Sequence, residues 1–303
     1  MSKTLSLLVG DNPFHGISHL SQEKARARTL EHNQTSIMQA AKLVDLSLEN
    51  GADGFMLSVD ETTISILKNL QTKQPVNLYA IAPYAFEYVR KSTQTGGVAG
   101  LAKSLAKEMV FSSNIKVIVA NLFGLARFNP SALLKTYIAY ELSRINQAMS
   151  SNFELKSFML HELVTDMALA LNMEKLCKTH IRFLKNRNIR PGFETRNFPY
   201  LVQKFSEWNI DFSDLTLTCA FNKVGFQMCP TQADCEQALE RAQNAEVIAM
   251  SILAAGYLKP SDAIGYLGSF PGLSGVVVGV SKEQQAIETF RVLRQNNKPI
   301  LPA

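Results

Sequence analysis

The chain has 303 residues, and its 31 lysines and arginines outnumber its 26 aspartates and glutamates by 31 − 26 = 5. This mild excess is spread without a sustained basic run, which argues against nucleic-acid binding, because phosphate recognition needs a continuous positive surface. Apolar residues make up 46% and charged residues 19% of the chain. This composition excludes a disordered or fibrous protein and predicts a large buried core.

The N-terminal apolar run, from Leu5 to Val9, is too short for a signal peptide or a membrane span. We therefore expect a soluble, cytoplasmic protein with no membrane or nucleic-acid partner. No two of the four cysteines form a CxxC motif. We therefore expect reduced thiols rather than a disulfide framework or a zinc ribbon. They are Cys177, Cys219, Cys229 and Cys235.

Short apolar runs alternate with longer stretches of helical spacing from end to end. The helical stretches include one closed by Gly51, one opened by Asn129 and Pro130, and one that follows Ser281. Nine apolar runs predict strands buried on both faces. These runs are 5–10, 54–59, 77–84, 116–123, 156–162, 190–196, 215–221, 246–253 and 275–280. Such alternation predicts right-handed βαβ units and a parallel sheet.

A closed (β/α)8 barrel, the TIM barrel, fits this pattern better than an open sheet. No glycine-rich dinucleotide turn follows the first strand, and a spacing of about 30–40 residues suits eight βα units. Nine candidates are one too many, so we expect an extra strand, N-terminal or inserted; counting back from the C-terminus leaves 5–10 outside the ring. No linker divides the chain, and residues 1–303 are expected to form a single domain.

Polar residues follow most of the predicted strands, at the end of the barrel where active sites of this architecture lie. Ten of them are candidates for catalysis or substrate binding. They are Asp11, His15, Tyr84, Asn121, His161, Glu162, Glu194, Arg196, Asn222 and Lys223.

Two pairs carry the clearest chemistry. As neighbours at a strand end, His161 and Glu162 are expected to point to opposite faces, so only one aims at the barrel axis. Glu194 and Arg196 are two residues apart and share a face. They form either a self-satisfied ion pair or a carboxylate beside a guanidinium that binds an anionic substrate. His161 and Glu194 are the predicted acid–base residues.

Two other arrangements point to different reactions. Lys223 is either a Schiff-base nucleophile, if an apolar surrounding lowers its pKa, or a solvated loop lysine. His15, together with His161 and Glu194, offers mixed nitrogen and oxygen ligands for a divalent metal, although no spacing signature supports a metal site.

The last predicted strand leads into a helix through small residues. We expect Ser281 to cap a helix that begins at Lys282, so that backbone N–H groups, the hydroxyl and the amine form an anion site. The alternative is a helix cap with nothing bound.

From about residue 157 to residue 294, the order of motifs resembles the C-terminal half of the aldo-keto reductase superfamily. The motifs are FMLHE, ETRNF, CAFN, VIAMSILAAGYL and VVVGVSKEQQAIETF. The resemblance implies that the family's active-site histidine falls on His161, and that Ser281 and Gln285 grip the nicotinamide dinucleotide phosphate, NADP. Thr289 stands where the family usually has asparagine.

The N-terminal half departs from this family. Asp60 stands where the family's aspartate is expected, but no tyrosine follows it nearby. The family's lysine is expected where Ile81, Ala82 and Pro83 stand, and Tyr84 is the only phenol in reach. Because that lysine lowers the pKa of the family's catalytic tyrosine, the usual proton donor cannot be assembled.

Together these patterns predict a barrel enzyme that acts on a small polar or anionic metabolite. His161 and Glu194 are its acid–base residues, Arg196 binds an anion, and a phosphate-bearing ligand lies at Ser281. Reduction with NADP is possible but disfavoured. The alternatives are an aldolase-type lyase that uses Lys223, a metal-assisted isomerase, and a binding barrel without catalysis.

Overall fold

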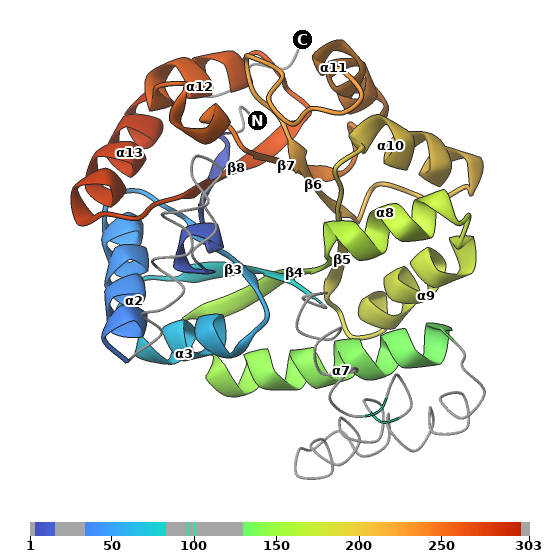
Figure 1. The fold of residues 1–303 in the computed structure, drawn as a ribbon, viewed down its shortest axis with the longest axis horizontal. Helices are drawn as coiled ribbons and strands as arrows, with labels where there is room; N and C mark the ends of the chain where they lie inside the picture. Colours follow the sequence, from blue (N-terminus) through green and yellow to red (C-terminus); the bar gives the residue numbers. More distant parts are fainter. Residues whose placement is uncertain (1–3, 16–33, 83–95, 97–99, 101–129, 298–303) are drawn as a thin grey trace.

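A computed structural model describes residues 4–15, 34–82, 96, 100 and 130–297. Eight parallel strands pair in chain order and close into a ring (Figure 1). The predicted (β/α)8 barrel is therefore confirmed. The strands are β1 (Ser6–Gly10), β2 (Gly54–Ser58), β3 (Val76–Ile81), β4 (Phe153–Leu160), β5 (Arg190–Glu194), β6 (Thr216–Ala220), β7 (Glu246–Met250) and β8 (Leu273–Gly279).

Helices of the described segments surround this ring (Figure 1). Two of the expected helix ends are confirmed, because Pro130 begins α7 and Gly51, with φ +116°, follows α2. The α-helices are α2 (Gln34–Glu49), α3 (Glu61–Asn69), α7 (Pro130–Ala148), α8 (Glu162–Ala170), α9 (Glu174–Lys185), α10 (Phe198–Glu207), α11 (Gln232–Arg241), α12 (Pro260–Leu267) and α13 (Glu283–Asn296). Short 3-10 turns, η1 (Asn12–His15) and η2 (Ala254–Gly256), follow β1 and β7.

The first strand belongs to the ring, so of the two options for the extra candidate the N-terminal one is wrong. β1 pairs in parallel with both β2 and β8, over Leu8–Gly10 and Ser6–Gly10 respectively. β3 pairs directly with β4, so the ring closes without the run 116–123, which lies outside the described residues. The surplus candidate therefore belongs to the long connection between β3 and β4.

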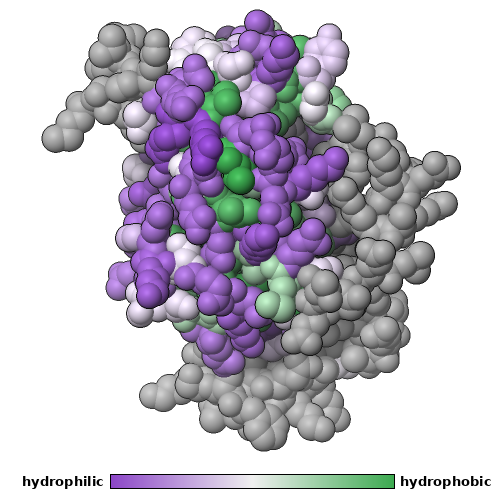
Figure 2. Space-filling model, turned by 90° about the vertical axis from the view of Figure 1, so that its left-hand side faces the viewer, coloured by the Kyte–Doolittle hydropathy of each residue, from purple (hydrophilic) through white to green (hydrophobic). Residues whose placement is uncertain are grey.

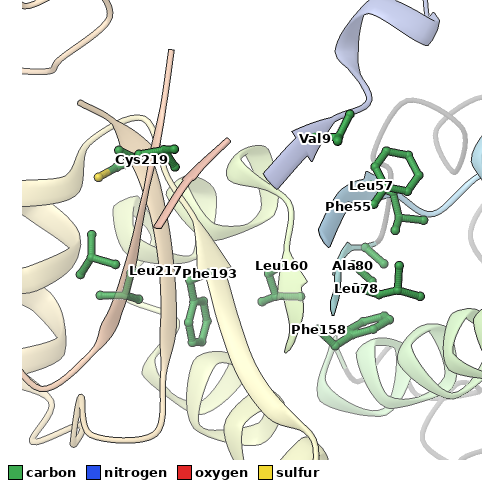
Figure 3. Close-up of a cluster of buried hydrophobic side chains, with 14 of the residues drawn as sticks. Val9, Phe55, Leu57, Leu78, Ala80, Phe158, Leu160, Phe193, Leu217 and Cys219 are labelled. Atoms are coloured by element: carbon green, nitrogen blue, oxygen red, sulfur yellow. The ribbon is translucent and has the colours of Figure 1, made fainter. Parts of the chain in front are cut away.

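Successive strand residues face opposite sides of the barrel wall. On β2, Phe55 and Leu57 pack outward in the cluster between barrel and helices (Figure 3), whereas Met56 lies in a separate cluster inside the ring. On β4, Phe158 is outward and Met159 inward. This two-residue alternation explains why the strands are apolar throughout, and it determines which side chains reach the barrel interior.

The outer surface differs from this core. α2 and α13 pack together on the left of Figure 1, and the side of the molecule that they occupy is largely hydrophilic (Figure 2). Among the helices in the described segments, none combines the length and the apolar content needed to cross a membrane.

Candidate active site

A cavity of about 420 Å³ lies at the C-terminal ends of the strands. Its lining brings together His161, Glu194, Arg196 and Ser281, which follow or end β4, β5 and β8. These side chains were expected to share one rim of the barrel, and they do. The roles predicted for them depend on their individual surroundings.

His161 and Glu162 are not strand residues, contrary to expectation. β4 ends at Leu160, and His161 is the N-cap of α8, where its Nδ1 accepts the backbone N–H of Leu163 at 3.2 Å. Strand alternation therefore does not apply, and both side chains line the cavity. Because Nδ1 accepts a hydrogen bond, the neutral imidazole carries its proton on Nε2.

Glu194 ends β5 and is only 8% exposed. Its Oε2 accepts the backbone N–H of Glu162 at 3.0 Å. Burial, reinforced by the nearby charge of Glu162, raises the pKa of Glu194 to about 8. At neutral pH the carboxyl is therefore mostly protonated, and it offers an O–H donor to a molecule in the cavity.

His161 is shifted in the opposite sense. Burial lowers its pKa below the ordinary value of 6.5, and this effect outweighs the attraction of Glu162. The imidazole is therefore neutral at pH 7. His161 and Glu194 thus give the cavity two uncharged groups that can hold or transfer a proton.

Arg196 pairs with Glu162 rather than with Glu194, which corrects the predicted pair. The reason is that Glu194 ends the strand beneath the N-terminus of α8, whereas Arg196 lies beyond the strand at the cavity rim. Arg196 Nη1 also donates to Gln227 Oε1 at 2.8 Å, and Ser251 Oγ donates to the same oxygen at 3.1 Å. The guanidinium is held in place while its side chain stays 43% exposed.

Gln227 was not predicted as a site residue. It lines the cavity from the turn after β6, with φ +59°, a conformation that is uncommon for a residue with a side chain. Nothing in the sequence around it marks this conformation, so only the structure reveals its position.

The expected site residues after β6 do not line the cavity. Asn222 is buried and organises its own turn, with Nδ2 donating to Phe226 O at 2.8 Å and Oδ1 accepting Phe226 N at 2.9 Å. Lys223 is exposed to solvent. This position corresponds to the loop lysine and gives no support to a Schiff-base role. Tyr84 and Asn121 lie outside the described residues.

Asp11, His15 and Asp60 form a buried array beside the cavity. His15 Nε2 lies 3.1 Å from Asp11 Oδ2, and His15 Nδ1 lies 3.2 Å from Asp60 Oδ2. Asp11 lines the cavity and also accepts the backbone N–H of Ser58 at 2.6 Å. Asp60 caps α3 by accepting the N–H of Thr63.

The helix after β8 begins one residue later than predicted. α13 begins at Glu283 with Lys282 at the N-cap, so Ser281 is not the helix cap. Instead, the N–H of Ser281 donates to Gln285 Oε1 at 3.0 Å, and both side chains border the cavity. Lys282 is exposed and lies outside the cavity lining. The side chain of Gln285 therefore satisfies the backbone N–H of Ser281 just before the helix begins.

The loop after β7 borders the cavity and contains several residues with left-handed backbone conformation. Ser251, Ala254 and Ala255 have positive φ values of 55°, 46° and 57°. Ile252, Leu253 and Ala255 line the cavity, and within the described residues their backbone N–H groups have no acceptor. Left-handed residues that turn N–H groups toward one side are typical of anion-binding loops. The sequence SILAAG shows that the loop contains small residues, but it does not indicate their left-handed backbone conformation.

A metal site is not formed by the described residues, which contain no group of three or more His, Cys, Asp or Glu able to hold a metal ion. Both ring nitrogens of His15 face carboxylates. His15 therefore does not join His161 and Glu194 in a shared ligand set.

Comparison with known proteins identifies the fold. No family model and no curated protein matches the sequence. Two crystal structures described as candidate aldo-keto reductases of Pseudomonas aeruginosa are similar, with TM-scores of 0.57 and 0.55 and 11% identity each. Both alignments cover 97% of this chain, and they cover 92% and 91% of those proteins. The chain therefore folds as an aldo-keto-reductase-like TIM barrel, as the motif order implied.

Proposed function

We propose that this barrel is an enzyme that acts on the carbonyl group of a small polar or anionic compound. The observation that carries the proposal is Glu194, a carboxylic acid held protonated near pH 7 in a cavity at the catalytic end of the barrel. A neutral carboxyl can donate its proton to a carbonyl oxygen as negative charge develops there. His161, neutral with its proton on Nε2, is the second donor.

The cavity walls restrict the substrate class. Met56, Ile81, Met250 and Val277 contribute apolar surface, and a volume of about 420 Å³ suits a compound of a few carbon atoms beside any cofactor. Arg196 is oriented at the rim by Glu162 and Gln227. An oriented guanidinium is the preferred partner of a carboxylate, so the proposed substrate is a small oxo acid.

A nicotinamide dinucleotide is the cofactor that the fold suggests, and donors suited to its phosphates lie after β7 and β8. Ile252, Leu253 and Ala255 would supply backbone N–H groups, and Ser281 and Gln285 would supply polar side chains. When bound in its reduced form, such a cofactor supplies a hydride. Glu194 would deliver the proton that completes reduction of the carbonyl. It would replace the tyrosine and lysine of the aldo-keto reductases, which the motif order resembles.

Uncharged aldehydes should be poor substrates. Ile81 lines the cavity where the resemblance calls for lysine, so no ammonium group activates a phenol there, and an uncharged aldehyde gains nothing from Arg196. With NADPH and benzaldehyde, we expect turnover well below the enzyme median of about 10 per second. A small oxo acid such as glyoxylate should be reduced faster.

The measurement is the loss of NADPH absorbance with each substrate, using wild type and Arg196→Met. Loss of the preference for the oxo acid in the variant is expected. Benzaldehyde turnover near the median rate, or no reduction of any oxo acid despite NADPH binding, would contradict the proposal.

A further inference from the structure

The Asp11, His15 and Asp60 array supplies no reacting group in the proposed reduction, yet its side chains are only 6%, 8% and 13% exposed. Burying two carboxylates and an imidazole is costly unless they are paired. Here the pairing is complete on the imidazole, because each ring nitrogen faces a carboxylate oxygen within 3.2 Å. Both nitrogens can donate only when the ring is an imidazolium.

The charges around His15 agree with this geometry. Burial alone would lower its pKa, but the hydrogen bond that His15 donates to Asp11 and the charges of Asp11 and Asp60 together raise the pKa above 6.5. Asp11 comes from the end of β1 and Asp60 from the N-cap of α3, so carboxylates from both neighbouring elements face the ring. The geometry and the raised pKa both favour the imidazolium form of His15 between the two carboxyl groups.

Asp11 is the member of the array that reaches the cavity. One of its oxygens accepts two N–H groups, from Ser58 and His15. Asp11 and Glu194 line the same cavity, and the charge of Asp11 is one of the causes that keep Glu194 protonated. One carboxylate and one carboxylic acid thus share the wall around a single space, an arrangement typical of acid–base pairs.

We propose that Asp11 is a catalytic base and that the cavity has a second activity, the enolisation of a small oxo acid without a nicotinamide cofactor. The inference rests on the proposed role of Glu194 as the acid. Asp11 removes a proton from the carbon next to the carbonyl, and the electron pair of that C–H bond becomes the C=C bond of the enol. The carbonyl oxygen takes the proton of Glu194, which is left as a carboxylate. The reverse step restores both groups.

His15 and Asp60 are positioning residues in this proposal. The imidazolium donates to Asp11 and fixes its orientation, and Asp60 holds the imidazolium. His15 touches Asp11 without lining the cavity, so its effect on the reaction is indirect.

Exchange of carbon-bound hydrogen with solvent deuterium tests the second activity directly. Wild type in D2O, without nicotinamide, is mixed with pyruvate or 2-oxobutyrate, and loss of the proton signal next to the carbonyl is followed by NMR. Asp11→Asn keeps an acceptor for Ser58 but removes the base. We expect exchange by wild type and a loss of at least ~100-fold in Asp11→Asn, the lower range for a general base.

Asp53→Asn is the matched control. Asp53 also accepts a backbone N–H, from Leu7 at 2.8 Å, and also pairs with a cation, Arg294, but it precedes β2 at the opposite end of the barrel. Its exchange rate should equal that of wild type. Equal rates in wild type and Asp11→Asn, or no exchange by wild type, would overturn the inference.

His15→Gln separates positioning from simple structural support. Removing the cation beside Asp11 should change the shape of the pH profile of the exchange rate, because the base then works without a neighbouring positive charge. A structural role alone would lower the rate equally at every pH, and that result would refute the positioning role.

If NADPH-dependent reduction survives in Asp11→Asn while exchange is absent even in wild type, the second activity fails and the proposed reduction stands. If exchange occurs without any reduction, the proposed reduction fails instead.

Discussion

Replacing Glu194 with glutamine should lower turnover of an oxo acid by about 10²–10⁴-fold, the contribution expected of a general acid. Glutamine has nearly the same shape and can still accept the N–H of Glu162, now 3.0 Å from Glu194 Oε2. It cannot release a proton at any working pH. In wild type, activity should decline as pH rises through about 8, because the carboxyl is then ionised before the substrate binds. Steady-state rates across pH check both expectations.

Glu246→Gln is the control for this substitution. Glu246 begins β7 at the other end of the barrel, where Oε1 accepts from Tyr79 at 2.7 Å and Oε2 lies 3.0 Å from Arg190 Nη1. This variant should keep its turnover even if its stability falls. Comparable losses in the two variants would mean that Glu194 acts only through the fold.

Glu194→Gln should also change how stability depends on pH. The ordinary carboxyl pKa of 4.5 applies to the unfolded chain, whereas the folded value is about 8. Between these values the folded state holds a proton that the unfolded state has lost, so wild-type stability from this group falls as pH rises from 4.5 to 8. The slope is at most ~1.4 kcal/mol per pH unit. The glutamine variant lacks this pH-dependent contribution to the free energy of unfolding. Urea denaturation of both proteins at several pH values measures the difference.

Gly54→Ala should destabilise the barrel strongly. A Cβ at Gly54 would lie 2.1 Å from the backbone oxygen of Asn77, its partner on β3. Backbone cannot rotate away as a side chain can, so the alanine must separate β2 from β3. We expect a loss of about 3 kcal/mol or more, at the upper end for overpacking, seen as a lower urea midpoint.

Gly265→Ala provides the comparison. Gly265 lies within α12, and a Cβ there would meet nothing within 4 Å. Alanine should stabilise the helix by up to about 1 kcal/mol, since glycine is the poorer helix former. We therefore expect the two substitutions to change the stability of the protein in opposite directions. A Gly54→Ala variant with unchanged stability would show that β2 and β3 are not this closely paired.

The fold was predictable because its signals are periodic and local. Apolar runs interrupted by helical spacing specified the βα units, and Pro130 and Gly51 marked helix ends. The number of strands was harder to predict, because an apolar run such as 116–123 carries the same signal whether or not it joins the ring. Only long-range pairing, of β1 with β8 and of β3 with β4, determines which runs close the barrel.

The sequence predicted which residues line the cavity better than it predicted which partners they contact. His161, Glu194 and Arg196 line the cavity because they follow strands, a rule that sequence position captures. Their partners were not predictable, because a shift of one residue at the end of β4 turns His161 into a helix cap and brings Glu162 to Arg196. The strained turn at Gln227 depends on backbone geometry that residue type does not specify.

The protonation of Glu194 at neutral pH can be measured directly by carboxyl NMR, without knowledge of the substrate. Protein labelled with ¹³C at the glutamate carboxyl carbon is titrated, and the Glu194 signal is assigned by its absence in Glu194→Gln. We expect a titration midpoint near 8 for this signal. A midpoint near the ordinary value of 4.5 would contradict it, because the carboxyl would then be ionised and unable to act as the acid.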